Sequence, residues 1–137
     1  MKSAFTFRAL RHDEWADFEA RTKYIPGRQF GGIVACKDGE PVGAVGLDNW
    51  SGRTVSVHWW IRHPRCIPAL WAELLSYLRQ YDYAHLIGTI PSDNVRSLRG
   101  ALRLGWKELA RIKDGWAVGT DIVILEYHNG EQLEAAR

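Results

Sequence analysis

The sequence contains few cysteines and no long hydrophobic run, and both absences restrict where the protein can work. Cys36 and Cys66 are its two cysteines, and their separation of 30 residues fits neither a metal-binding motif nor a disulfide framework. No window reaches the ~18 consecutive apolar residues of a transmembrane helix, and the first residues lack the apolar core of a signal peptide. We therefore expect reduced thiols, no membrane association and a cytoplasmic location.

The net charge is also small, at +2 for 137 residues, and this argues against nucleic acid as the main partner. Arg96, Arg99 and Arg103 share one face of a predicted helix, and a solvated surface is the simpler interpretation of that arrangement. The histidines other than His58 have no spacing typical of metal ligands, so we predict no metal site.

What the chain does contain is enough apolar sequence for one core. Its composition is 46% hydrophobic and 25% charged, which is normal for a soluble globular domain. We predict a single domain over residues 1–128, followed by a polar tail over residues 129–137. Seven tryptophans are many for this length. The ones that suit either the core or a ligand pocket are Trp50, Trp59, Trp60 and Trp116.

Hydrophobic periodicity and turn residues divide the chain into strands and helices. Apolar residues between 67 and 81 recur at the spacing of one helical face, and Pro68 suits the first turn of that helix. Residues 54–62 alternate as in a strand with two different faces. The dipeptides Asp38-Gly39 and Asp114-Gly115 predict hairpin turns.

The predicted order of elements is β-α-β-β-β-α-β-α-β-β. They are expected at residues 4–8, 14–21, 32–37, 41–47, 54–62, 67–81, 85–90, 95–104, 106–113 and 118–127. Strands joined by hairpins precede two helical crossovers. We therefore expect an α/β (α+β) fold with a mixed sheet of about seven strands, antiparallel first and parallel in the middle, with helices on both faces.

The segment 92–106 carries a more specific pattern. Asn94 opens the predicted helix, the small residue Ser97 follows three positions later, and Gly105-Trp106 ends the segment. This pattern, together with the order of elements, resembles the GNAT superfamily of acetyl-CoA-dependent N-acetyltransferases. The turn Pro64-Arg65-Cys66 is also similar to one in short GNAT-like proteins encoded by bacteriophages. The resemblance implies the GNAT fold and, for a phage protein, the host cytoplasm.

The resemblance also implies a binding site for acetyl-CoA as co-substrate. In such a fold two parallel strands separate and leave backbone groups for the pantetheine arm, while N–H groups at a helix N-terminus bind the pyrophosphate. In this chain the turn is 62–67, where Arg62 and Arg65 add positive charge. The residues expected to contact the coenzyme are Trp60, Ile61, Arg62, His63, Arg65, Cys66, Ile67, Asn94, Ser97 and Arg99.

The chain departs from the family pattern at two places. The turn 62–67 has none of the family's glycines, and Pro64 and Pro68 each lack an N–H donor. Ala101 stands where many members have a tyrosine that protonates the departing thiolate. The resemblance therefore implies an acid from elsewhere in the chain, or from water.

No motif identifies the general base. His58 is the first candidate, because its ordinary pKa lies near neutrality and the family places its base nearby. Asp48, at the end of the preceding strand, is the second candidate. Structural roles compete with these functions: His58 as a core histidine with a satisfied ring, Asn94 as a helix cap and Cys66 as an unreactive thiol.

Three functions stay open at this level. The first is an N-acetyltransferase, in which an unknown amine acceptor attacks the thioester of acetyl-CoA directly. The second is a catalytically inactive GNAT-like protein of a phage, which assembles in the virion or binds a host protein; the glycine-free turn and Ala101 favour it. The third, nucleic-acid binding or base modification, is the weakest at this net charge. Monomer and homodimer both stay open.

Overall fold

The computed structural model describes residues 5–22, 29–80, 83 and 85–128, so the predicted tail 129–137 lies outside the described residues. Within them the predicted order of elements is confirmed, with two short 3-10 helices (η) added. The elements are β1 (Thr6–Ala9), η1 (His12–Glu14), α1 (Trp15–Thr22), β2 (Gln29–Lys37), β3 (Glu40–Ser51), β4 (Thr54–Ile61), η2 (Pro64–Cys66), α2 (Ile67–Arg79), β5 (His85–Pro91), α3 (Val95–Arg103), β6 (Lys107–Ala117) and β7 (Thr120–His128).

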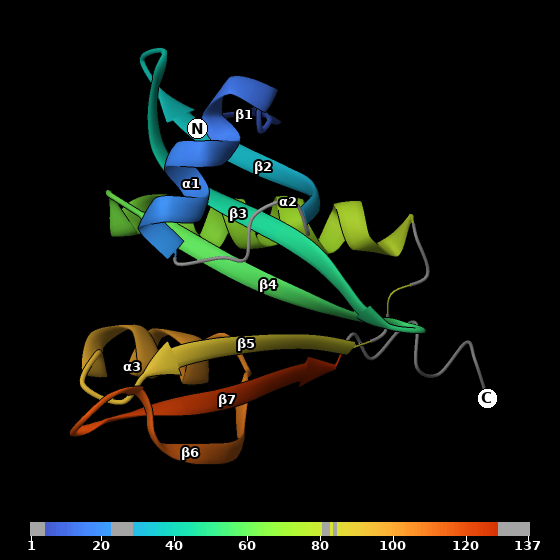
Figure 1. Cartoon of the computed structure of the whole chain (residues 1–137). Coiled ribbons are helices and arrows are strands. Elements are labelled where there is room, and N and C mark those ends of the chain that lie inside the picture. Colours follow the sequence, from blue (N-terminus) through green and yellow to red (C-terminus); the bar gives the residue numbers. More distant parts are fainter. Residues whose placement is uncertain (1–4, 23–28, 81–82, 84, 129–137) are drawn as a thin grey trace.

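The strands form one seven-stranded sheet in the order β1-β2-β3-β4-β5-β7-β6 (Figure 1). Neighbouring strands are antiparallel except for β4 and β5, which are parallel. The predicted mixed sheet is therefore confirmed. The single parallel pair follows from the crossover through α2, because a helix that returns the chain along the sheet brings the next strand in with the same direction.

The parallel pair holds together only at its beginning. Residues pair as Thr54–His85, Val55–Leu86 and Ser56–Ile87. The strands run on to Ile61 and Pro91, and over this part the described residues have no further pairing between β4 and β5. Figure 1 shows β5 and β7 diverging from β4. The sheet is thus opened in its middle, and two halves of the domain meet at the closed end of the opening.

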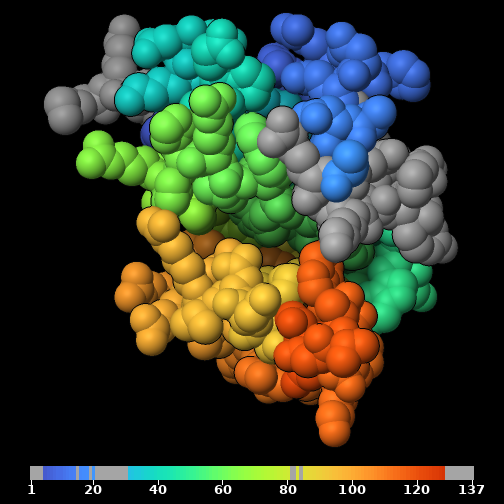
Figure 2. Space-filling model, turned by 60° about the vertical axis from the view of Figure 1, so that its left-hand side comes forward, coloured from blue at the N-terminus to red at the C-terminus, as the bar shows by residue number. Residues whose placement is uncertain are grey.

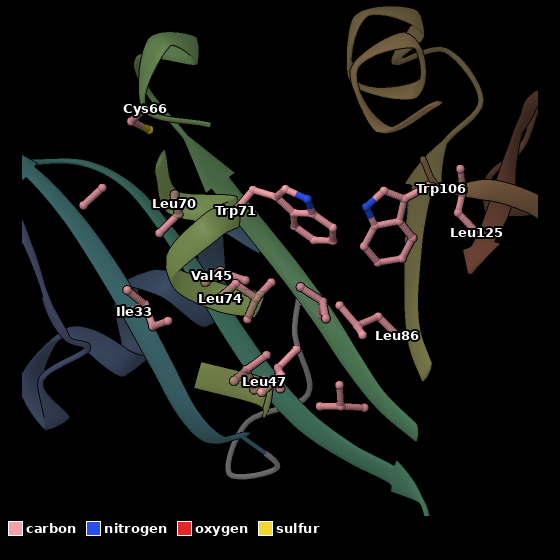
Figure 3. Close-up of a cluster of buried hydrophobic side chains, with 14 of the residues drawn as sticks. Ile33, Val45, Leu47, Cys66, Leu70, Trp71, Leu74, Leu86, Trp106 and Leu125 are labelled. Carbon is pink, nitrogen blue, oxygen red and sulfur yellow. The ribbon is translucent and has the colours of Figure 1, made fainter. Parts of the chain in front are cut away.

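Helices cover both faces of the sheet, as predicted. The main core lies beneath α2 and joins Leu70 and Leu74 to strand residues such as Val45 and Leu86 (Figure 3). The α3 residue Leu98 packs against the same core. On the opposite face α1 covers a smaller cluster; its buried members are Phe18, Val34, Cys36 and Ala44. The predicted two-faced pattern of β4 is confirmed, because Val55 and Val57 enter the main core while Trp60 packs against the smaller cluster.

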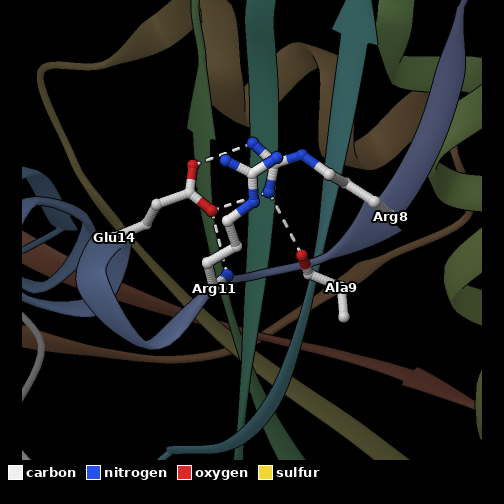
Figure 4. Close-up of polar contacts among 4 residues, drawn as sticks. All are labelled: Arg8, Ala9, Arg11 and Glu14. Atoms are coloured by element: carbon white, nitrogen blue, oxygen red, sulfur yellow. Dashed lines mark hydrogen bonds and ion pairs between the residues drawn. The ribbon is translucent and has the colours of Figure 1, made fainter.

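Strand β1 is fixed to η1, the short helix before α1, by a bidentate ion pair. The guanidinium of Arg8 donates to both carboxylate oxygens of Glu14, at 2.6 and 2.9 Å, and the Arg11 backbone N–H donates to the same carboxylate (Figure 4). The hydrogen bonds from Arg8 lower the pKa of Glu14 to about 2. On the sheet side, a Cβ at Gly46 would lie 2.4 Å from the Phe18 ring, so only glycine allows α1 this close.

One predicted turn was wrong and one was confirmed. Asp38-Gly39 forms the turn between β2 and β3, with positive φ at both residues. The turn between β6 and β7 lies at Val118-Gly119, whereas Asp114-Gly115 lies inside β6. Asp114 has a φ of 54°, and hydrogen bonds hold it there: its N–H donates to Asp121 and its carboxylate accepts from the Gly119 N–H. These contacts across the hairpin stabilise an irregularity in the strand instead of a reversal.

Candidate functional site

The opening between β4 and β5 contains a cleft of about 320 Å³. Residues from both diverging strands line it, together with residues from α3 and from the beginning of α2. Figure 2 shows the α2 side (green) and the α3 side (yellow to orange) meeting along a recess on this face. The lining residues are Val57, His58, Trp59, Ile61, Ile67, Gly88, Thr89, Ile90, Pro91, Asn94, Ser97, Gly100, Ala101, Leu104, Trp106, Trp116 and Leu125.

The edge of β4 supplies backbone groups to this cleft. The Val57 carbonyl points toward β5, since a Cβ at Gly88 would lie 3.7 Å from it. The Trp60 carbonyl points the other way, toward Gly43 on β3. Because alternate residues of a strand direct their N–H and C=O groups to opposite neighbours, the main chain of Val57, Trp59 and Ile61 faces the cleft. These groups have lost their partner strand and are placed to hydrogen-bond an extended ligand.

Aromatic rings occupy the region where the two halves meet. Trp71 on α2 lies 5.9 Å from Trp59 and 5.7 Å from Trp106, measured between ring centroids. Tyr127 on β7 contacts both Trp71, at 4.8 Å, and Trp106, at 5.8 Å. Figure 3 shows the Trp71 and Trp106 side chains facing each other between the two halves. Such rigid rings fill the space between the diverging strands and hold them apart.

The cleft lining is almost free of charge. Among the described residues the lining includes no aspartate, glutamate, lysine or arginine, and His58 is its one titratable side chain. Burial lowers the pKa of His58 from 6.5 to about 4, because the protonated ring loses its hydration. Its Nε2 lies 3.1 Å from the Ser56 hydroxyl. The ring is therefore neutral at neutral pH and is able to accept a proton only as a weak base.

The N-terminus of α3 presents polar groups to the cleft. Asn94 caps the helix, and its side-chain oxygen accepts the Ser97 N–H at 3.2 Å. Both residues line the cleft, and so does Ala101 one turn further along. The cap role of Asn94 is thus real, and it places the side-chain amide at the cleft as well. The Ala101 position offers a methyl group and no hydroxyl.

The N-terminus of α2 is built differently. The N–H groups of Arg62 and His63 both donate to the Val42 carbonyl, at 2.9 and 3.0 Å. The Cys66 N–H donates to the His63 carbonyl, and the Ile67 N–H to the Pro64 carbonyl. Most donors of this turn are therefore used inside the chain, and they are not directed into the cleft.

Cys66 anchors the same turn to the sheet. Its side chain is fully buried, and a Cβ at Gly43 would lie 2.7 Å from the sulfur. Burial raises the pKa of the thiol, which keeps it protonated. Cys36 is also buried, and both cysteines are free thiols. These surroundings fit the unreactive interpretation of Cys66.

The predicted site residues divide into two groups in the structure. Those in the cleft lining are His58, Ile61, Ile67, Asn94 and Ser97. Those outside the lining are Asp48, Trp60, Arg62, His63, Arg65, Cys66 and Arg99. In the second group, Asp48 is partly buried on β3 and lies opposite Ser56. Trp60 packs against the cluster beneath α1. The three arginines and His63 are exposed.

No motif or spacing in the sequence marked several of the lining residues as part of a site. Gly88 is one, and a glycine inside a strand was the available hint of a close approach. A Cβ there would lie 3.4 Å from the Trp106 ring. Among the four tryptophans proposed for a pocket, Trp59 and Trp116 line the cleft, whereas Trp50 is 60% exposed elsewhere on the surface.

In the described residues, no helix combines the length and the apolar character that crossing a bilayer requires. Among the same residues, no three or more histidine, cysteine or acidic side chains come together as metal ligands would.

No protein-family model and no curated protein sequence match the chain. Solved structures do match it. An assigned GNAT-family acetyltransferase from Desulfovibrio desulfuricans superposes with a TM-score of 0.73 at 15% identity, covering 91% of this chain and 99% of that one. The ribosomal-protein-S18-alanine N-acetyltransferase of Escherichia coli gives 0.73 at 13% identity, covering 90% and 93%. An assigned acetyltransferase from Salmonella typhimurium, solved with its cofactor acetyl-CoA, gives 0.72 at 14% identity, covering 92% and 94%. The chain therefore has the fold of the GNAT acetyltransferases.

Proposed function

We propose that the protein is an N-acetyltransferase that moves an acetyl group from acetyl-CoA to an amine. The observation that carries this proposal is the cleft between β4 and β5, with the unpaired main chain of Val57, Trp59 and Ile61 along one side. A pantetheine arm contains amides that pair with such groups much as a strand would. Support comes from a protein of the same fold that is solved with acetyl-CoA, and from another whose name specifies an alanine as acceptor.

In the proposed reaction the amine nitrogen attacks the thioester carbonyl. The C–N bond forms, the C–S bond breaks, the nitrogen loses a proton and the departing sulfur gains one, so no further reactant is needed. His58 is our first candidate for the proton acceptor, because its neutral ring lines the cleft. With a pKa of about 4 it deprotonates an ammonium group poorly, and we therefore expect the acceptor to react from its free-amine form. Asp48 stays the second candidate.

The predicted residues inside the cleft lining and those outside it are proposed to contact different parts of acetyl-CoA. Ile61, Ile67, Asn94 and Ser97 line the cleft and are proposed to contact the arm. For the phosphates we propose Arg62, His63, Arg65 and Arg99, all of which are exposed. Trp60 and Cys66 are proposed to act indirectly, by packing behind β4 and behind the turn. With Ala101 in the cleft, we propose that water protonates the thiolate.

Calorimetric titration with acetyl-CoA tests the proposal. We expect saturable binding to the wild-type chain, and a loss of more than about 30-fold in Ala101→Trp, because the indole fills the cleft beside α3. Arg103→Trp is the matched control: it places the same side chain on the exposed face of α3, outside the cleft lining, and should bind as wild type. The absence of binding at about millimolar acetyl-CoA would contradict the proposal.

The alternative is a catalytically inactive phage protein that binds a virion or host protein. It predicts no affinity for acetyl-CoA in the same titration and a specific partner in a pull-down. The phage origin, the cytoplasmic location and the choice between monomer and homodimer stay predictions from the sequence.

A further inference from the structure

We infer that the cleft recognises its donor through the pantetheine arm, and that the 3′-phosphorylated ADP part of the coenzyme adds little to binding. The inference rests on the proposed function and specifies its donor class. Thioesters of pantetheine that lack the nucleotide would then serve as donors. The acetyl group leaves the pantetheine sulfur for the amine nitrogen, and the proton lost by the nitrogen ends on that sulfur.

The cleft matches the chemistry of the arm. Pantetheine is uncharged and carries two amides, and the lining offers no charged side chain but does offer the main-chain edge of β4. A volume of about 320 Å³ lies at the small end of ligand pockets. It suits one part of a large coenzyme, and the part it suits by polarity is the arm.

The turn before α2 does not match the chemistry of a pyrophosphate. Anion binding at a helix N-terminus depends on several N–H groups that point outward. Between residues 62 and 68, Pro64 and Pro68 have no N–H, and Arg62, His63, Cys66 and Ile67 donate to carbonyls of the chain itself. Arg65 is the one residue of this turn whose N–H has no hydrogen bond within the described part of the chain.

These donors are costly to release. Val42 accepts two of them, and the buried Cys66 sulfur is in close contact with β3 at Gly43. Turning the Arg62 and His63 N–H groups outward takes hydrogen bonds from the carbonyl of the buried Val42, and an unpaired buried carbonyl destabilises the fold. Coenzyme binding would have to offset that destabilisation before any contact with the phosphates is gained.

The start of α3 also uses backbone donors within the chain. The Ser97 N–H is taken by the Asn94 side chain and the Leu98 N–H by the Asn94 carbonyl. The donors proposed for the phosphates are the Arg65 N–H and the exposed side chains of Arg62, His63, Arg65 and Arg99, outside the cleft lining. Exposed ion pairs contribute little to binding, and they weaken with salt. The nucleotide contribution is therefore small and depends on ionic strength.

Calorimetry with S-acetylpantetheine and with acetyl-CoA, at low and high salt, tests the inference. We expect the two dissociation constants to differ by less than about tenfold at low salt and to converge at high salt. Adenosine 3′-phosphate 5′-diphosphate, the nucleotide part alone, should show no saturable binding in the same titration. The double variant Arg62→Ala/Arg65→Ala should narrow the difference between the two thioesters to about threefold.

The outcomes separate the two proposals. A preference for acetyl-CoA of more than about 100-fold that persists at high salt would overturn the inference and leave the proposed function intact. Saturable binding of the nucleotide part alone would overturn it as well. If neither thioester binds, the proposed function fails and the inference fails with it.

Discussion

Two helices begin beside the same cleft, yet their N-termini are built in opposite ways. The start of α2 has no side-chain cap, contains prolines, and uses its N–H groups on carbonyls of its own turn and of β3. The start of α3 has a capping side chain in Asn94, is exposed, and contributes Asn94 and Ser97 to the cleft lining. The start of α2 is held against the sheet by hydrogen bonds, and the start of α3 contributes polar residues to the cleft lining.

The difference shows that a helix position in a fold does not by itself create a binding site. The dipole favours anions at both N-termini. Whether the N–H groups are available is decided by a few local residues: a proline that lacks the donor, a carbonyl close enough to take it, or a cap that satisfies it. For this chain the polar contacts of the cleft come from α3 and from β4 and not from the start of α2.

The largest effect is expected from a substitution that disrupts the packing of the turn before α2 against β3. In Gly43→Ala the new methyl would lie 2.7 Å from the Cys66 sulfur and 3.2 Å from Ile61, so the turn must move off β3. We expect a loss of about 1–3 kcal/mol in the free energy of unfolding, measured by urea denaturation. Adding Cys66→Ala should recover part of that loss, because it removes the clashing atom. Independent, additive effects of the two substitutions would refute the contact.

A second effect concerns His58, which lies on β4 between the two helix starts. Folding lowers its pKa from 6.5 to about 4, so the neutral ring stabilises the fold above pH 6.5, and this stability is lost as the pH falls toward 4. Allowing for partial exposure, the loss amounts to about 2 kcal/mol.

His58→Gln should remove that part of the pH dependence. The comparison is urea unfolding of both proteins at several pH values between 6.5 and 4. Glu14, whose pKa is about 2, is present in both proteins, so its titration cancels in the difference. Parallel curves for the two proteins would show that His58 is not buried as described.

A third, smaller effect tests the start of α3. Asn94→Ala removes the cap and should cost about 1 kcal/mol of stability. It should also weaken thioester binding, since the Asn94 side chain lines the cleft. Asn94→Ser is the matched control, because serine keeps a capping oxygen. If the serine variant restores stability but not binding, the amide contacts the ligand; if it restores both, Asn94 acts as a cap alone.

The smallest effect is a gain. Gly100 lies inside α3, and a Cβ built there meets no atom within 4 Å. Gly100→Ala should therefore stabilise the protein by about 0.5–1 kcal/mol, through helix propensity, in a thermal or urea unfolding experiment. Because the methyl enters the cleft lining, thioester affinity should fall slightly in the same variant. A destabilised variant would contradict the open space beside α3.

The sequence predicted local features well. Helix α2 begins at the predicted residue, and four of its apolar positions, Leu70, Trp71, Leu74 and Leu78, are buried as the helical spacing predicted. Both ends of α3 follow local chemistry: Asn94 caps the start, and Gly105, at a φ of 102°, follows the end. Such signals act within a few residues, so no tertiary contact was needed to read them.

Contacts between distant residues explain what the sequence missed. The Asp114-Gly115 turn was predicted from a dipeptide, and hydrogen bonds with Gly119 and Asp121 decided otherwise. Gly88 and Trp106 both line the cleft, because β5 lies close to the residues that follow α3. The sequence gives no sign of this proximity. The N–H groups of the turn 62–67 were counted for a ligand, but the Val42 carbonyl, on another strand, accepts two of them.

By itself, the sequence determined the order of the elements, the two faces of β4 and the cap of α3, because periodicity and capping depend on near neighbours along the chain. Only the tertiary structure decided where β4 and β5 separate, which strand edge is left without a partner, and which backbone donors are already used. Those properties depend on aromatic packing between the two halves and on carbonyls brought in from β3. The order of the elements could therefore be predicted from the sequence, whereas the lining of the cleft is known only from the folded structure.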